Sequence, residues 1–197
     1  MDLNTTGHLA VVAVPINGEV IKLGKKPRNY RSKLYHTCFK LRKEKKFREL
    51  KRIKNRERAT FKDLNQKISR AIVETARCHE CGIKLERLFG QGASNRKKHR
   101  CALEFSFDTG SFYQLQRMVE LKARKAGIPV AYIDPSSTST RCRVCGQIGI
   151  RHRKKFECPH CGHADHADVN AAFNIAATPL PEGIEGRHSG AVCFNTL

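Results

Sequence analysis

Two closely spaced cysteine pairs near the C-terminal end constrain this 197-residue chain more than any other feature. In each pair two residues separate the cysteines, and twelve residues separate the pairs. A Cys-x2-Cys pair predicts a tight turn whose thiolates point to one side, and two such turns close a tetrahedral zinc site. Gly146 and Gly162 follow the pairs, where the turn favours a positive φ. The predicted zinc ligands are Cys142, Cys145, Cys158 and Cys161.

A closed set of four thiolates leaves no open coordination position, so we expect the zinc to be structural. His160 and His163 lie nearby, and we expect both at the surface because the thiolates complete the coordination. The other pair, Cys78-x2-Cys81, has no partner pair at suitable spacing, and packing or free thiols is the simpler interpretation. An odd total of nine cysteines, with metal-ligand spacing, favours a reducing compartment over a disulfide scaffold.

The net charge of +20 is concentrated in one segment. Residues 22–70 hold 20 Lys and Arg against 4 Asp and Glu, a net charge of +16. A field of that size predicts nucleic-acid binding, although a solvated basic surface or binding to an anionic membrane would also fit. The apolar run from Leu9 to Val14 is too short to span a bilayer, and no signal peptide is visible. We expect a cytosolic protein, nucleoid-associated in a prokaryote.

The hydrophobic pattern of the first half predicts a strand pair and then a long helical segment. Residues 9–14 form a buried strand, Asn17-Gly18 is a strong two-residue hairpin signal, and residues 19–23 return as the partner strand. Residues 30–77 contain no Pro or Gly and carry apolar residues at spacings of three and four. They predict a basic helical hairpin with its break near residues 55–60.

The second half predicts shorter elements. Residues 82–88 form a short strand, 90–100 a Gly-rich basic loop, 128–133 a buried strand, and 168–177 a helix. Between them, residues 111–126 predict a helix that Gly127 ends, capped by Asp108 or Thr109. Its expected inward residues are Phe112, Leu115, Val119 and Leu121. The last residues, 178–197, have no periodicity and predict a disordered tail.

Three carboxylates stand in distinctive settings. Asp2 precedes the first strand pair, Glu86 lies in an otherwise apolar strand, and Asp168 opens an Ala-rich helix after the cysteine pairs. Such carboxylates can converge to bind two Mg²⁺ ions about 4 Å apart, and a pair of ions at this distance can catalyse the hydrolysis of phosphodiesters. From spacing alone the signal is weak, because an acid at a helix start is also a simple partner for the helix dipole.

Longer motifs around these residues resemble a known family. The stretch D-P-S-S-T-S-T-R-C-R-V-C-G (134–146), then C-P-H-C-G-H (158–163) and A-D-V-N-A-A-F-N-I-A (167–176), is similar to the C-terminus of OrfB/TnpB proteins. These are insertion-sequence-encoded proteins related to compact type V CRISPR nucleases. K-L-E-R-L around Glu86 resembles their second nuclease motif, and M-D-L-N-T-T-G-H-L-A-V-V resembles their first.

The resemblance implies an α/β fold, a RuvC-like, RNase H-type domain with a helical insertion and an inserted zinc ribbon. It implies a transposon-associated, RNA-guided DNA endonuclease with Asp2, Glu86 and Asp168 holding catalytic Mg²⁺ or Mn²⁺, and DNA and a guide RNA as partners. The expected division is a nuclease core (1–137, with the hairpin 30–77), the ribbon (138–163), a final core helix (164–177) and the tail.

The chain departs from the family pattern at its start. Full-length members carry a sizeable N-terminal region for guide and target recognition, and an apolar strand leads into the Asp of their first motif. Here Met1 alone precedes Asp2. We therefore expect a truncated copy or a fragment, with weak or absent cleavage on its own. The alternatives are a non-catalytic nucleic-acid-binding protein on the same fold, or a zinc-ribbon transcription-type factor, which would leave Glu86 and the D-V-N-A-A helix unexplained. Oligomeric state stays open.

Overall fold

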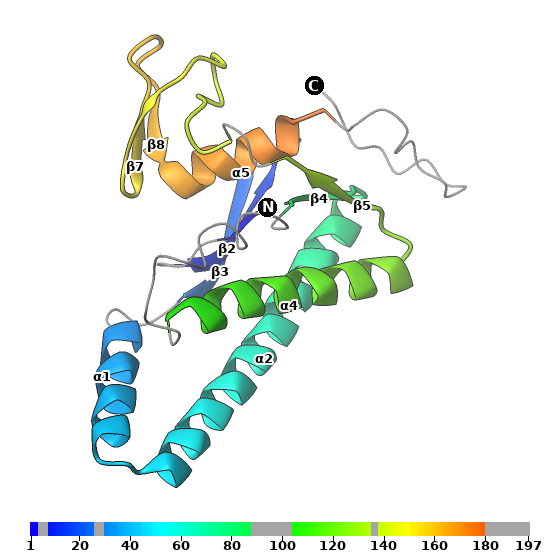
Figure 1. The fold of residues 1–197 in the computed structure, drawn as a ribbon. Helices are drawn as coiled ribbons and strands as arrows, with labels where there is room; N and C mark the ends of the chain where they lie inside the picture. Colours follow the sequence, from blue (N-terminus) through cyan, green and yellow to red (C-terminus); the bar gives the residue numbers. More distant parts are fainter. Residues whose placement is uncertain (4–7, 26–29, 88–103, 135–137, 180–197) are drawn as a thin grey trace.

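The computed structural model describes residues 1–3, 8–25, 30–87, 104–134 and 138–179, which form a mixed α/β arrangement (Figure 1). The first sheet is antiparallel, in the order β1 (Asp2–Leu3), β2 (His8–Val14) and β3 (Glu19–Lys25). The second pairs β4 (Ile83–Glu86) and β5 (Val130–Ile133) in parallel. The third, also antiparallel, contains β6 (Ile150–His152), β7 (Lys155–Glu157) and β8 (Ala164–His166).

The hairpin of β2 and β3 forms where the sequence predicts it, but its loop comprises residues 15–18 and not the two residues Asn17 and Gly18 alone. Gly18 adopts a φ of +72° and its N–H donates to the carbonyl oxygen of Val14 at 3.0 Å. Gly24, with a φ of +68°, lies beside helix α2, and a Cβ there would stand 2.5 Å from Cδ1 of Ile68 on that helix and 3.0 Å from Cδ1 of Leu9. A side chain at this position would clash with both of these side chains and would strain the backbone.

Strand β2 is covered on both faces, which explains its continuous run of apolar residues. Leu9 and Ala10 belong to the main core, which α2 (Phe47–Cys78) and α4 (Glu104–Lys125) close from one side. Val11 and Ala13 pack instead against α5 (Ala167–Ala177) on the other side. The first sheet therefore lies between the long helices and α5 (Figure 1).

The two sheets of the core meet at β1 and β4. The backbone nitrogen of Met1 donates to the carbonyl oxygen of Lys84 at 3.0 Å. Helix α5 packs against β1, β2 and β4, and the Lys84 ammonium donates to the carbonyl oxygens of Ala176 and Thr178 at 2.7 and 2.9 Å, at the helix C-terminus. One helix thus fixes both sheets in place.

The predicted helical hairpin exists, but its break lies elsewhere. Helix α1 (Tyr30–Lys43) ends before residues 44–46, and α2 runs without interruption through residues 55–60. At the turn, Lys45 adopts a φ of +56°, and the N–H of Lys46 donates back to the carbonyl oxygen of Leu41. The turn has no Gly or Pro, so its position depends on the tertiary contact between the helices, which composition does not reveal.

Helix α4 differs from its prediction at the start and on one face. It begins at Glu104, so Asp108 and Thr109 lie inside the helix and do not cap it. Leu115 and Val119 are fully buried as expected, whereas Leu121 is 48% exposed, because it falls on the opposite side of the helix. Gly127, with a φ of +71°, follows the end of the helix.

Strand β5 is fully buried only at alternate residues, since Ala131 and Ile133 are buried while Val130 and Tyr132 are half-buried and pack against the main core. The predicted loop 90–100 lies outside the described residues, as does the predicted tail apart from Thr178 and Pro179. In the described stretches, no helix combines the length and apolar character that crossing a membrane requires.

Candidate functional site

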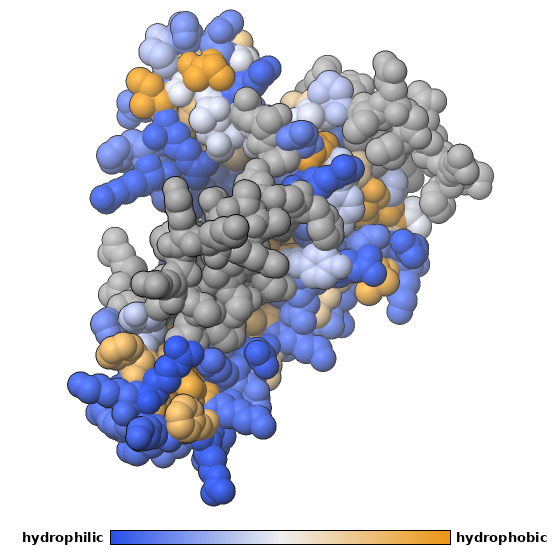
Figure 2. All heavy atoms as spheres, viewed as in Figure 1, coloured by the Kyte–Doolittle hydropathy of each residue, from blue (hydrophilic) through white to orange (hydrophobic). Residues whose placement is uncertain are grey.

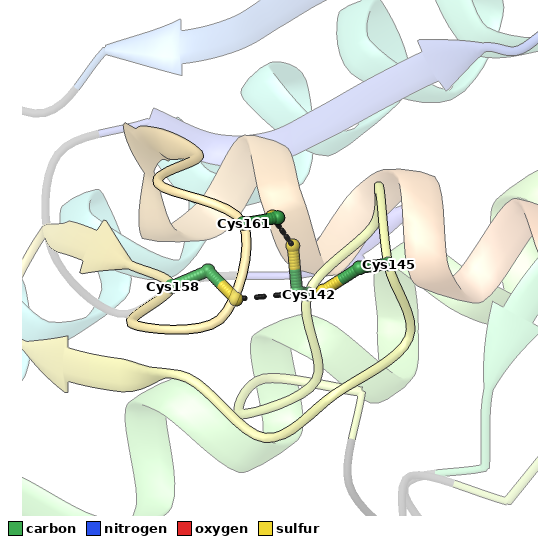
Figure 3. Close-up of side chains that lie close together, drawn as sticks. All are labelled: Cys142, Cys145, Cys158 and Cys161. Atoms are coloured by element: carbon green, nitrogen blue, oxygen red, sulfur yellow. Dashed lines mark hydrogen bonds between the residues drawn. The ribbon is translucent and has the colours of Figure 1, made fainter.

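The four predicted zinc ligands converge at one point (Figure 3). Their sulfur atoms all lie within 4.8 Å of one another, and they are the only such group of three or more potential ligands among the described residues. Sγ of Cys142 lies 3.7 Å from that of Cys161, and Sγ of Cys145 lies 3.5 Å from that of Cys158. Four thiolates around one Zn²⁺ at Zn–S bonds of about 2.3 Å would be about 3.8 Å apart, so the geometry fits the ion.

Each cysteine pair is held by the same two backbone hydrogen bonds. In the first, the N–H of Gly146 donates to the carbonyl oxygen of Cys142, and the N–H of Cys142 donates to that of Gln147, at 2.9 and 2.8 Å. In the second, Gly162 and His163 take the places of Gly146 and Gln147, at the same distances. Both glycines have a φ above +70°, as predicted. The turns are therefore set by local backbone geometry.

The environment of Cys158 favours its thiolate. Burial acts to raise the pKa of this thiol, but the N–H groups of Cys161 and His160 and the neighbouring thiols outweigh it and lower the pKa to about 6. Although the backbone N–H of His163 acts to lower it, burial and the three other thiols raise the pKa of Cys161 to about 12. A metal ion would therefore have to displace a proton from this cluster.

The ribbon is attached to α5 by a small core and by one buried amide. Phe156 is fully buried together with Cys142, Cys158 and Ala167. The side chain of Asn170 accepts a hydrogen bond from the N–H of Arg143 at 3.0 Å and donates to the carbonyl oxygen of Arg141 at 2.7 Å. Asn170 is completely buried, so it joins the first cysteine turn to the helix that carries Asp168.

Asp2 and Glu86 lie on neighbouring strands. Asp2 lies on β1 and is 8% exposed, and Glu86 is the last residue of β4. The two strands come together where the amino group of Met1 donates to the carbonyl oxygen of Lys84 on β4. Burial lowers the pKa of the Met1 amino group to about 6, against the opposing effect of both carboxylates. The hydroxyl of Thr138 donates to Oε1 of Glu86 at 2.5 Å. Both carboxylates therefore lie near the amino group of Met1.

Asp168 lies at the N-terminus of α5, and two cations from the ribbon contact it. Its side chain is 3% exposed, with Oδ1 3.1 Å from Nη2 of Arg151 and Oδ2 2.5 Å from Nζ of Lys154. Its N–H donates to Nδ1 of His166 at 3.3 Å. Burial lowers the pKa of His166, and a neutral ring can accept this bond. The structure therefore brings Asp168 to the ribbon hairpin.

Sequence reasoning missed the residues that hold the carboxylates. Arg151 and Lys154 stand out only as part of a basic stretch between the cysteine pairs, and nothing in that stretch indicates an ion pair across 17 and 14 residues. Thr138 carries no sequence signal for its contact with Glu86, 52 residues away. Of the nearby histidines, His160 is exposed as predicted, whereas His163 is half-buried and accepts a hydrogen bond from Arg143. Such contacts depend on tertiary structure.

Comparison with known proteins connects this site to one group. Residues 112–175 match the family model "Cas12f1-like, TNB domain". The chain is 37% identical over 123 residues to the CRISPR-associated endodeoxyribonuclease Cas12f1 of Sulfoacidibacillus thermotolerans, covering 60% of this chain and 27% of that protein. It is 27% identical over 158 residues to the TnpB-like protein MJ0751 of Methanocaldococcus jannaschii, covering 74% and 56%.

A solved structure shows the same fold at lower identity. A chain in the cryo-EM structure of a CRISPR-Cas12f ternary complex superposes with a TM-score of 0.66 at 17% identity, over 91% of this chain and 38% of that one. The protein thus has the mixed α/β fold of that Cas12f chain, together with a zinc-ribbon-like cluster of four cysteines. Together the matches show that the chain is similar to the TnpB-like proteins and the Cas12f endonucleases, in agreement with the resemblance of its motifs. It spans about a quarter to a little over half of the length of these curated relatives.

Proposed function

We propose that this chain is a divalent-metal-dependent DNA endonuclease domain with an RNase H-like, RuvC-type core, acting under RNA guidance. The observation that carries the proposal is the placement of its three acids. Asp2 on β1 and Glu86 on β4 lie beside the junction of the two sheets, and Asp168 begins the helix that packs on both. The contact between Met1 and Lys84 supports one mixed sheet in the order β3-β2-β1-β4-β5.

In this proposal Asp2, Glu86 and Asp168 hold the catalytic ions, and Cys142, Cys145, Cys158 and Cys161 hold a structural zinc. Mg²⁺ or Mn²⁺ would activate water and stabilise the leaving oxygen of a phosphodiester. The chain's own contribution is to position oxygen ligands. Thr138 orients Glu86 through its hydrogen bond, and the start of α5 places Asp168 beside the ribbon hairpin. Arg151 and Lys154 balance the charge of Asp168, and a divalent ion must compete with them.

Partners and domain limits are part of the same proposal. The Cas12f1 relative is named an endodeoxyribonuclease, and the superposed structure is a ternary complex. The basic segment of residues 22–70 gives this chain the charge to bind nucleic acid. We extend the proposal to DNA and a guide RNA as partners, with residues 1–137 and 164–177 as the nuclease core and 138–163 as the inserted ribbon.

A non-catalytic nucleic-acid-binding protein on the same fold is the second candidate. The ion pairs of Asp168 favour it, because a buried carboxylate with two cationic partners also serves as a structural link between ribbon and helix. Both candidates bind nucleic acid, and they differ in whether the acids take part in chemistry.

Cleavage separates the two candidates. End-labelled single-stranded DNA is incubated with zinc-loaded protein and Mn²⁺ over hours, with Asp168→Ala and Asp63→Asn alongside. Asp63 is an exposed acid paired with Lys67, far from the site in sequence. The nuclease proposal predicts slow, metal-dependent cleavage that Asp168→Ala abolishes and Asp63→Asn retains. Because weak or absent cleavage is expected of the chain alone, binding without cleavage supports the second candidate only where the wild-type protein also fails to bind Mn²⁺. Cleavage that survives Asp168→Ala contradicts the assigned site.

A further inference from the structure

The far end of the helical hairpin has a small core of its own. We use the name hairpin tip for residues 34–54, which include the end of α1, the turn and the start of α2. Cys38, Leu41 and Leu50 are buried there, with Leu34 and Ile53 packed against them. This cluster is separate from the main core. The inward faces of both helices are thus already occupied by each other.

Aromatic rings lie on the outer surface of the hairpin tip. Phe39 is 57% exposed and Phe47 is 62% exposed. Tyr35, one turn before Phe39, stacks on it with ring centroids 6.3 Å apart and planes 19° from parallel. Figure 2 shows apolar atoms at the surface of this lower end, among hydrophilic ones. Rings this exposed add little to the stability of the fold, since most of their apolar surface remains in water.

The charge around these rings is strongly positive. The hairpin tip contains nine Lys and Arg and two Glu, a net charge of +7. Within the described part of the chain, ion pairs involve only two of these cations, Lys40 and Lys46, both with Glu44. The other cations are available to a ligand. A protein partner that covered the rings would have to desolvate the surrounding cations or supply many acidic residues, whereas a polyanion neutralises these cations directly.

We propose that the hairpin tip binds single-stranded nucleic acid, with bases stacked on Phe39 and Phe47 and phosphates on the surrounding cations. This inference rests on the proposed function only in that the chain acts on nucleic acid, and it adds where and in what form the strand is bound. Unpaired bases expose the aromatic faces that stacking needs, while a duplex keeps them inside. Exposed rings within a basic surface therefore discriminate single strands from duplexes.

The test compares a variant without the two rings with a variant that has fewer charges. Phe39→Leu with Phe47→Leu removes the rings but keeps helix-compatible apolar side chains and the net charge. Lys43→Glu with Lys45→Glu reverses two charges and keeps the rings. Tyr113→Leu removes a ring that is 46% exposed on α4, outside the hairpin tip, and is the matched control. Fluorescence anisotropy measures binding of the full chain to oligo(dT), oligo(U) and duplex DNA of about 20 nucleotides, longer than typical binding sites.

The ring variant is expected to lose roughly tenfold or more in affinity for the single strands, given the usual contribution of base stacking. Its duplex affinity and salt dependence should stay the same, since no charge is removed. The charge variant should weaken binding to all probes. Comparison of oligo(dT) with oligo(U) shows whether DNA or RNA is preferred. Crosslinking of a photoreactive oligo(dT) to wild-type protein should map to residues 35–47.

Equal affinities of wild type and ring variant for single strands, with crosslinks elsewhere, would overturn the inference. If the charge variant still weakened binding in that case, nucleic-acid binding would stand and only the stacking site would fall. If neither variant changed binding, both ideas would fail. If the ring variant changed only the sedimentation of the protein, the rings would belong to a contact between copies of the chain, which also contradicts the proposal.

Discussion

The ribbon and the proposed carboxylate site would hold a metal ion in opposite ways. The four cysteines come from two short turns with identical backbone hydrogen bonds, and their sulfur atoms are gathered within 4.8 Å. The three proposed ligands come from β1, β4 and α5, elements that only the packing of the core brings into contact. One site is built locally, and the other depends on the whole fold.

The charges of the two sites differ in the same way. The cysteine cluster contains only thiol side chains, and four thiolates this close would repel one another unless a metal ion bound them. The acid at α5 already has cationic partners from the protein, Arg151 and Lys154. We therefore expect the ribbon to depend on its ion for folding, and the carboxylates to be stable without theirs.

The largest effect should come from the ribbon. Cys158→Ser is expected to abolish zinc binding and to unfold residues 138–166, because structural zinc contributes about 10–16 kcal/mol to such modules. The main core should keep its cooperative unfolding, since it contains no cysteine ligand. Metal analysis and hydrogen exchange measure both. Cys78→Ser, at an exposed cysteine outside the cluster, is the control and should retain one zinc per chain. Zinc retained by the Cys158→Ser protein would refute the assignment.

A smaller effect is expected at the joint between the two sites. Asn170→Ala leaves the N–H of Arg143 without its buried acceptor, while the carbonyl oxygen of Arg141 keeps a hydrogen bond from the side-chain amide of Asn174 at 2.6 Å. The free energy of unfolding of zinc-loaded protein should fall by about 1–3 kcal/mol, from one unsatisfied group. Asn55→Ala, at an exposed position of α2, should change it by less than about 0.5 kcal/mol. Equal stability of the two variants in denaturant titrations would mean that ribbon and helix are not coupled through this amide.

The smallest effect concerns the charge on Asp168. Lys154→Met removes one of its two cations, so a divalent ion meets less competition there. Mn²⁺ affinity should rise about two- to fivefold, because a partly exposed ion pair contributes up to about 1 kcal/mol. Lys155→Met, at the neighbouring exposed position, is the matched control and should leave the affinity unchanged. Calorimetric titration with Mn²⁺ measures the difference, and unchanged affinity in the Lys154→Met protein would show that the cation does not compete.

The sequence predicts what depends on neighbours along the chain. The cysteine cluster, the hairpin at Gly18 and helix α5 follow from spacing, turn residues and periodicity, and all three are confirmed. The predicted position of the break between α1 and α2 is wrong by about ten residues, because tertiary packing determines where a helix ends when no Gly or Pro ends it. Leu121 is wrong for a related reason, since the face of α4 that is buried depends on α2.

The carboxylates show where such reasoning stops. Their selection as Asp2, Glu86 and Asp168 depends on resemblance to family motifs, since spacing alone does not connect acids that are 84 and 82 residues apart. The structure adds which groups contact them, such as Thr138 and Lys154, and these contacts decide how each acid is held.

The central claim is that the three acids form a divalent-metal site, and Mn²⁺ binding tests it most directly. Zinc-loaded protein is titrated with Mn²⁺ and the free ion is followed by electron paramagnetic resonance. Saturable binding is expected in wild type and in Asp63→Asn, and it should be lost in both Glu86→Gln and Asp168→Asn. Absence of binding in wild type, or binding that neither site variant weakens, would contradict the account.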